Sequence, residues 1–218
     1  MLSIAGIGTL ERVLEVGTGK GALTRELVKR GKSLVGYEID RENFQETVEA
    51  VRGTGAKIVL ADAFEQKPEF DVLVSSLPYS ASATFVQWLC GLEFRRAVVV
   101  LQEDFVRKIT AQPGERDYRG VSALTGLAFG VEVLGRVGRS SFSPPPRVSS
   151  VIVSFTPKQR VAHDEVSNIM RLFSLRRRRV DSALAELGMA KPGSFGLRRV
   201  NSLRPEEVHA ICRASRNQ

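Results

Sequence analysis

The chain has 218 residues, of which 43% are hydrophobic and 26% are charged, and its formal net charge is +8. This size and composition predict a globular protein with one α/β domain and a small additional part. No apolar run reaches the roughly 18 residues that a membrane span needs. Two cysteines and two histidines are too few for a disulfide scaffold or a Cys/His metal module. We therefore expect a cytoplasmic protein without a metal site or a membrane span.

The positive charge is concentrated at one end of the chain. Residues 1–157 hold 19 basic and 18 acidic residues, a net charge of +1. Residues 158–218 hold 13 basic and 6 acidic residues, a net charge of +7. A near-neutral part joined to a basic one indicates a polyanionic partner. We expect two domains, covering residues 1–157 and 158–218, with the second binding the polyanion.

Short apolar runs alternate with amphipathic segments in the first domain. Strands are expected over 12–16, 33–37, 56–60, 71–75, 97–101, 131–137 and 148–155, and helices over 22–30, 41–51, 83–92 and 103–112. This alternation predicts an α/β fold in which a parallel sheet has helices on both faces. After residue 157, three helices are expected, over 163–175, 177–187 and 205–214.

A glycine-rich loop follows the first expected strand and opens a helix. It contains Gly17, Thr18, Gly19 and Gly21, with glycine at every second position. Glycine lets the backbone turn tightly and approach a ligand closely. The spacing differs from the G-x-G-x-x-G of pyrophosphate-binding loops, which disfavours a nicotinamide oxidoreductase. Alone, the triplet also fits a tight strand–helix turn without a ligand.

Acidic residues stand near the ends of three successive strands. Glu38 ends the second strand and can accept hydrogen bonds from ribose hydroxyls. Asp62, next to Ala63, can accept one from an adenine amino group, and Glu15 can face an ammonium group or the loop amides. Singly, these residues fit solvated strand ends or helix caps. Together, at three successive strand ends of one sheet, they predict a site for S-adenosylmethionine, a nucleoside that carries an amino acid.

The fourth strand ends in Ser76-Leu77-Pro78-Tyr79, a motif typical of methyltransferases that act on exocyclic amino groups of bases. The lone pair of adenine N6 is delocalised, and acceptors aimed at its hydrogens localise it. Ser76 Oγ and the Leu77 carbonyl are the candidate acceptors. Pro78 stiffens the turn, and Tyr79 can stack on an extruded base. The alternative is an ordinary turn with Tyr79 in the core.

Several segments make the chain resemble the ribosomal RNA adenine N6,N6-dimethyltransferases. They are residues 13–19, 37–40, 76–79, 102–118, 142–148, 173–179 and 203–207. The resemblance implies a Rossmann-like S-adenosylmethionine-dependent methyltransferase sheet and a small all-helical C-terminal domain. It also implies dimethylation of two adjacent adenines near the 3′ end of small-subunit rRNA, in ribosome biogenesis. The expected partner is the small ribosomal subunit precursor, and the protein is expected to be a monomer.

The resemblance also implies roles for individual residues. The expected catalytic residues are Ser76, Leu77, Pro78, Tyr79 and Phe142, with Phe142 stacking on the target adenine opposite Tyr79. The expected cofactor-binding residues are Glu15, Gly17, Thr18, Gly19, Gly21, Glu38, Ile39, Asp62, Ala63 and Ser76. The expected RNA-binding residues are Arg147, Arg176, Arg177, Arg178 and Arg179, which would contact phosphates. A run of arginines is also typical of a solvated helix face.

Two features depart from the family pattern. Ser76 stands where the family usually has Asn. Serine keeps an acceptor oxygen but has a shorter side chain, and this predicts weaker activity. Only residues 1–11 precede Arg12, whereas the family carries a longer segment there that covers the cofactor, so we expect weaker cofactor binding. Two alternatives therefore stay open: a ribosome-biogenesis RNA-binding factor with little or no catalysis, and a methyltransferase for another nucleic acid.

Overall fold

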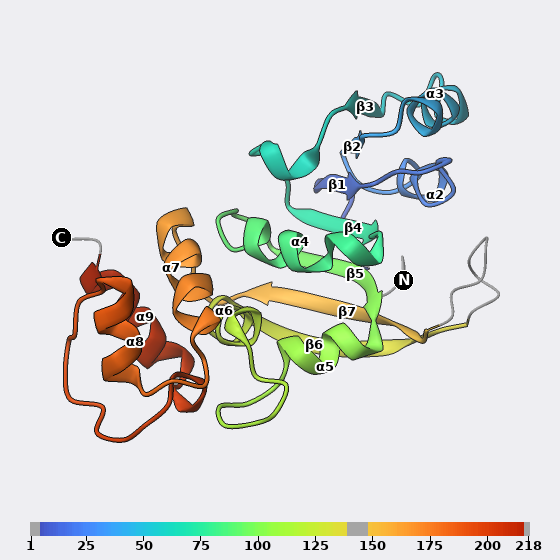
Figure 1. Ribbon diagram of the computed structural model, residues 1–218. Helices are drawn as coiled ribbons and strands as arrows, with labels where there is room; N and C mark the ends of the chain where they lie inside the picture. The colour runs from blue at the N-terminus through green and yellow to red at the C-terminus, as the bar shows by residue number, and fades with distance from the viewer. Residues whose placement is uncertain (1–4, 139–147, 216–218) are drawn as a thin grey trace. The chain divides into compact units, whose positions relative to one another are not determined.

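The computed structural model describes residues 5–138 and 148–215 of the chain (Figure 1). The chain splits into two compact units, each assembled from three segments. The first unit holds Met1–Phe85, Leu92–Glu103 and Val131–Pro157, and the second holds Val86–Gly91, Asp104–Gly130 and Lys158–Gln218. The second unit therefore includes segments from the middle of the chain as well as its end. The division into domains at residue 157 stays a prediction.

A seven-stranded sheet organises the first unit (Figure 1). Its strands are β1 (Arg12–Val16), β2 (Ser33–Glu38), β3 (Lys57–Leu60), β4 (Val72–Ser76), β5 (Arg96–Gln102), β6 (Phe129–Val137) and β7 (Ser150–Pro157), in the order β3-β2-β1-β4-β5-β7-β6. The pairs from β3 to β5 are parallel, as the alternation predicts. β7 runs antiparallel to β5. The expectation of a wholly parallel sheet is therefore wrong for this edge, because β7 enters the sheet beside β5 in the opposite direction.

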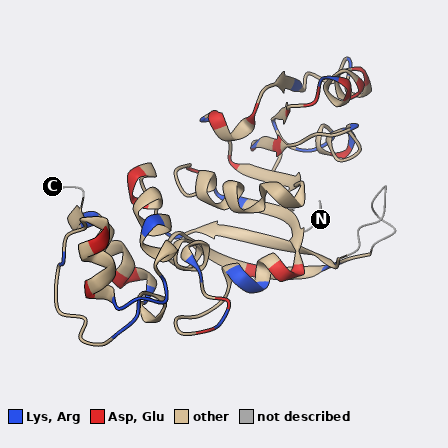
Figure 2. Cartoon of the chain, viewed as in Figure 1, with Lys and Arg blue, Asp and Glu red and all other residues tan. Residues whose placement is uncertain are grey.

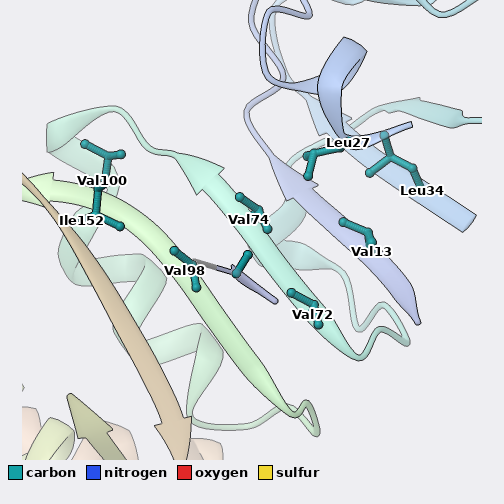
Figure 3. Packing of buried hydrophobic residues seen from close by; sticks show 9 residues of the cluster. Val13, Leu27, Leu34, Val72, Val74, Val98, Val100 and Ile152 are labelled. Atoms are coloured by element: carbon teal, nitrogen blue, oxygen red, sulfur yellow. The ribbon is translucent and has the colours of Figure 1, made fainter. Parts of the chain in front are cut away.

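Helices cover both faces of this sheet, as expected. They are α2 (Thr24–Leu27), α3 (Arg41–Ala50), the first turn of α4 (Ser82–Leu89) and the short 3-10 turns η1 (Ala63–Glu65) and η2 (Tyr79–Ala81); α5 (Glu103–Ile109) begins at the edge of this unit. On one face, Leu27 of α2 joins a buried cluster with Val72 and Val98 (Figure 3). On the other, Phe85 of α4 packs edge-on against Phe155, which pairs in register with Ala97. Because side chains alternate along a strand, Ala97 and Val98 face opposite sides.

The strand order reverses direction at β1, so the carboxyl ends of β1 and β4 form a topological switch point. β2 and β3 lie on one side of β1, and β4 and β5 lie on the other. The segment that follows β1 therefore leads to one side, toward β2, and the segment that follows β4 leads to the other side, toward β5. Ligands of open α/β sheets bind at such a switch point. Val16, which ends β1, leads into the glycine loop, and Ser76, which ends β4, leads into the Ser76–Tyr79 motif.

The second unit is built around α6 (Gly120–Ala128), a helix that the sequence did not predict. Its other elements are α7 (His163–Ser174), α8 (Val180–Leu187), the 3-10 turn η4 (Val200–Ser202) and α9 (Pro205–Ala214). Nearly all of α6 is buried, so it has no polar face and no helical periodicity. A Cβ on Gly120 would lie 3.0 Å from Met170 Sδ of α7, and one on Gly126 would lie 3.1 Å from Pro205 Cγ of α9. These glycines let both helices approach α6 closely.

The helices of the described residues differ in two further ways from the expectation. α8 begins at Val180, so Arg177, Arg178 and Arg179 precede this helix instead of forming its first turn. α2 has only four residues, fewer than the segment 22–30 predicts. Across residues 5–138 and 148–215, no helix combines the length and apolar character that crossing a bilayer requires.

Glu207 anchors the start of α9. Its Oε2 accepts a hydrogen bond from Arg204 N at 2.8 Å, and its two oxygens accept bonds from the Arg198 guanidinium at 2.7 and 2.9 Å. The hydrogen bonds from Arg198 lower the pKa of Glu207 from 4.5 to about 2. The carboxylate thus combines a helix cap with a bidentate ion pair.

We expect Glu207→Gln to lower the free energy of unfolding at pH 7 by about 1 kcal/mol, because Gln keeps an acceptor for Arg204 N but loses the charge that pairs with Arg198. Because the pKa of Glu207 is lower in the folded state, the carboxylate contributes fully above pH 4.5 and loses its contribution as the pH falls toward 2. Thermal unfolding of both proteins between pH 7 and pH 3 should show their difference shrinking. Glu206→Gln, at the neighbouring exposed position, is the control. A difference independent of pH would contradict the assignment.

Candidate active site at the ends of β1, β2 and β4

The glycine loop after β1 has a backbone that favours glycine. Gly17, Gly19 and Gly21 have φ angles of 71°, 53° and 75°, in the left-handed region that other residues rarely adopt. Gly17 N donates a hydrogen bond of 2.8 Å to the Tyr37 carbonyl of β2. A Cβ on Gly17 would lie 3.8 Å from Pro78 Cδ. The loop therefore lies directly against the Ser76–Tyr79 motif, which follows β4.

The Glu38 carboxylate holds the loop from the end of β2. It is buried, with an exposed fraction of 7%. Oε2 accepts a hydrogen bond from Gly19 N at 2.7 Å, and Oε1 accepts bonds from Ile39 N and Asp40 N, both at 2.9 Å. A carboxylate has about four acceptor positions. Three are occupied, so an acceptor position remains on Oε2, beside the glycine loop.

Glu15 presents a second carboxylate at this end of the sheet. Its side chain is buried in β1, and its Oε2 accepts no hydrogen bond from the described residues. The pKa of Glu15 is raised from 4.5 to about 8, mainly by burial; the Thr24 hydroxyl opposes this rise and the nearby Glu38 carboxylate adds to it. A buried acceptor without a partner is unfavourable. Such an atom is suited to a cationic or hydrogen-bond-donating ligand group.

The end of β3 adds a polar group and an apolar surface. Ala61 N donates a hydrogen bond of 3.0 Å to the Glu38 carbonyl, so this strand end lies beside that of β2. Asp62 Oδ1 accepts a bond from Phe64 N at 2.8 Å and caps η1, whose first residue, Ala63, is buried. Ile39 is 72% exposed. The strand ends thus combine acceptors with a hydrophobic side chain open to a ligand.

The Ser76–Tyr79 motif lies on the other side of the glycine loop. Ser76 is exposed at the end of β4, where it pairs with Val100 of β5, whereas Leu77 is buried. Pro78 N-caps η2, and its carbonyl accepts a hydrogen bond from Ala81 N at 2.9 Å. Tyr79 is half-buried, and its hydroxyl lies 2.8 Å from Ser150 Oγ of β7. The exposed Ser76 hydroxyl therefore lies at the end of β4, and the Tyr79 ring lies in the turn directly after it.

Two residues of this site were missed in the sequence. Thr47 of α3 is buried, and its hydroxyl donates a hydrogen bond of 2.6 Å to the Gly19 carbonyl and lies 3.3 Å from Thr18 Oγ1. Ser150 bonds to Tyr79 from β7. These contacts join residues 28 and 71 positions apart. A polar residue on the buried side of α3 was the one local signal for Thr47, and Ser150 had none.

The remaining predicted residues fall either outside the described residues or in the second unit. Phe142 and Arg147 lie outside the described residues. Arg176–Arg179 belong to the second unit, where they form an extended turn between α7 and α8. Their backbone pairs with the segment before η4: Val180 N donates to Arg198 O at 3.0 Å, and Val200 N donates to Arg178 O at 3.1 Å. We call residues 176–179 and 198–199 the arginine ribbon (Figure 2).

The six arginines of the ribbon are not equivalent. Arg178 forms an ion pair of 3.1 Å with Glu186, and Arg198 pairs with Glu207. Among the described residues, no carboxylate pairs with Arg176, Arg177, Arg179 or Arg199. Burial, followed by the charges of Arg119 and Arg177, lowers the pKa of Arg176. The ribbon therefore carries positive charge that no carboxylate within residues 5–138 and 148–215 neutralises.

Comparison with known proteins gives consistent matches. A family model described as ribosomal RNA adenine dimethylase matches residues 5–204. A probable ribosomal RNA small subunit methyltransferase A of Pyrococcus abyssi is 37% identical over 186 residues, covering 85% of this chain and 69% of that relative.

Solved structures agree with these sequence matches. A dimethyladenosine transferase from Plasmodium falciparum, 25% identical, superposes with a TM-score of 0.77 and covers 96% of this chain and 91% of its own. The 23S rRNA methyltransferase ErmE, also 25% identical, has a TM-score of 0.64 over 99% of this chain and 95% of its own. The resemblance noted in the sequence is confirmed: this chain belongs to the ribosomal RNA adenine dimethylase family.

Proposed function

We propose that this protein transfers methyl groups from S-adenosylmethionine to N6 of two adjacent adenines near the 3′ end of small-subunit rRNA, during ribosome biogenesis. The close approach of Gly17 to Pro78 carries the proposal, because it brings a glycine loop that can bind a ligand beside a base-amine motif. A transfer reaction needs donor and acceptor sites side by side. The membership of the family and the small-subunit relatives support this choice of substrate.

The residues of the first unit fit the cofactor. The open acceptor position on Glu38 Oε2 suits a ribose hydroxyl, and the unpartnered Glu15 Oε2 suits the ammonium group of the amino acid. The exposed Ile39 offers an apolar surface to the adenine ring, and the Asp62 carboxylate offers an acceptor to its amino group. When bound, S-adenosylmethionine supplies a methyl group that its sulfonium already activates.

The Ser76–Tyr79 motif fits the target base. The exposed Ser76 hydroxyl and the Leu77 carbonyl would accept hydrogen bonds from the adenine amino group and localise its lone pair, so that nitrogen becomes a better nucleophile. Pro78 reduces the freedom of the turn, which preorganises these acceptors. Tyr79 would stack on the extruded adenine, with Phe142 on its other side.

The arginine ribbon would hold the RNA backbone. Arg176, Arg177, Arg179 and Arg199 have no carboxylate partner in the described part of the chain and can pair with phosphates. Arg178 is already neutralised by Glu186 and would contribute less. We keep Arg147 as a further candidate phosphate contact, and residues 158–218 as the basic RNA-binding domain.

The direct test supplies tritiated S-adenosylmethionine and small ribosomal subunits that lack the modification. Label in N6,N6-dimethyladenine near the 3′ end is the expected result. Salt-sensitive binding of the subunit without label would instead identify a binding factor. The likeness to ErmE motivates a third substrate arm with protein-free 23S rRNA. Label in that RNA alone would identify a methyltransferase for a different nucleic acid.

Ser76→Ala should lower the turnover number about tenfold, because it removes one of two acceptors for the amino group. The affinity for the small subunit should stay within about twofold of the wild type, since this binding depends on the phosphate contacts. Ser76→Asn restores an acceptor and should remain active. Single-turnover methylation and a filter-binding assay measure the two quantities. A Ser76→Ala variant with full turnover would show that this hydroxyl is not an acceptor.

Thr47→Val should weaken the binding of S-adenosylmethionine about fivefold, because the loss of one hydrogen bond frees the Gly19 carbonyl and loosens the glycine loop. Valine has nearly the shape of threonine, so the packing of α3 changes little. Thr47→Ser keeps the hydroxyl and should bind as the wild type does. Isothermal titration calorimetry measures the affinities. Equal affinities for Thr47→Val and Thr47→Ser would contradict a role of this bond.

Replacing Arg177, Arg179 and Arg199 together by Gln should weaken binding to the small subunit and reduce the slope of log K against log salt by about 2. Arg178→Gln is the matched control, because Glu186 already neutralises Arg178. It should change the slope by less than about 1. Cofactor affinity should be unchanged in both variants. Equal slopes for the triple variant and the wild type would exclude the ribbon from RNA binding.

A further inference from the structure

Tyr79 is held at its far end by a residue from another part of the sheet. Its hydroxyl and Ser150 Oγ are 2.8 Å apart, and either atom can donate the hydrogen. Tyr79 follows β4, whereas Ser150 begins β7. The tyrosine side chain therefore reaches across the end of β5, which lies between these two strands. A contact of this kind fixes both ends of the ring, one through Cβ and one through the hydroxyl.

Ser150 is the rigid member of this pair. It is 1% exposed and pairs in register with Gln102 of β5. The preceding carbonyl, that of Ser149, accepts a hydrogen bond from Glu103 N at 3.0 Å. Tyr79, in contrast, starts a single 3-10 turn that no side chain caps at its beginning. The strand thus restrains the ring, and the ring does not restrain the strand.

We propose that Ser150 is a positioning residue, which holds the long axis of the Tyr79 ring in one direction through both methyl transfers to the same nitrogen. This rests on the proposed function, in which the ring stacks on the adenine. After the first transfer, the methylated amine must rotate about its bond to the ring before its remaining hydrogen can meet the acceptors. The base must stay stacked during this rotation. A ring that turns freely would let the monomethylated base leave before the second transfer.

The distribution of products tests this role. In Ser150→Ala, the ratio of N6-methyladenine to N6,N6-dimethyladenine, measured by nucleoside mass spectrometry, should rise about fivefold, the usual effect of one lost hydrogen bond. Tyr79→Phe removes the other partner and should give a similar rise. The double variant should give a product ratio no higher than that of either single variant, because both changes break the same bond. Ser150→Thr keeps the hydroxyl and should restore the wild-type ratio.

Ser154→Ala is the matched control. Ser154 is also buried in β7, 4% exposed, and pairs with Val98, away from Tyr79. Its product ratio should equal that of the wild type. Cofactor affinity and the unfolding temperature are measured for every variant. The proposal is overturned if Ser150→Ala keeps the wild-type ratio, or if Ser154→Ala changes the ratio equally.

A spectroscopic measurement separates this proposal from the proposed function. The chain has three tyrosines, Tyr37, Tyr79 and Tyr118, so incorporated 3-fluorotyrosine gives a fluorine spectrum in which Tyr79→Phe identifies one signal. Ser150→Ala should shift that signal and leave the other two in place. If the wild type transfers no methyl group but the signal shifts, the anchor exists and the proposed function has failed. If the signal does not shift, the anchor itself has failed.

Discussion

Three backbone N–H groups converge on the buried carboxylate of Glu38, and the geometry of the candidate site depends on this interaction. Two of these groups come from the turn after β2, and the third comes from Gly19 in the loop after β1. A buried carboxylate is costly unless hydrogen-bond donors surround it. If the loop after β1 and the turn after β2 separated, the Glu38 carboxylate would become exposed or would lose its donors. Thr47 closes the arrangement from α3 by bonding to the Gly19 carbonyl. The loop is therefore shaped before any ligand arrives, which reduces what binding must organise.

The sequence predicts this sheet better than it predicts the contacts around the site. Apolar runs locate β1 and β4 to within one residue. The glycines and acidic residues that follow such runs lie, as expected, at the carboxyl ends of strands in one sheet. The helix α6 was not predicted because nearly all of its residues are buried, including the polar Ser122 and Thr125, so no exposed polar face marks it in the sequence. The bond between Tyr79 and Ser150 spans 71 positions and depends on the antiparallel placement of β7 beside β5. No local pattern encodes such a placement, because it results from how the whole sheet is ordered.

Ion pairs, as well as sequence position, decide which arginines of this chain keep an unneutralised positive charge. The sequence shows four consecutive arginines as one group, whereas the structure separates Arg178, which pairs with Glu186, from its neighbours. It also brings Arg199 to them, through the backbone pairing of the arginine ribbon. A small cofactor and a single base need few positive charges, while a phosphate backbone needs several in a row. The near-neutral first 157 residues and the net charge of +7 in the rest are consistent with these separate demands.

The interleaving of the two units affects the order in which the protein can fold during synthesis. α6 leaves the ribosome before α7 and α9, yet Gly120 and Gly126 face those two helices. Its apolar surface therefore lacks its native partners until α7 has been made and lacks one of them until α9 has been made, whereas all strands of the sheet are complete by Pro157. Nascent chains of this protein expose a hydrophobic helix for longer than a protein with consecutive domains would, and they depend more on protection from aggregation. A fragment that starts at residue 158 lacks α6, the helix against which its own α7 and α9 pack.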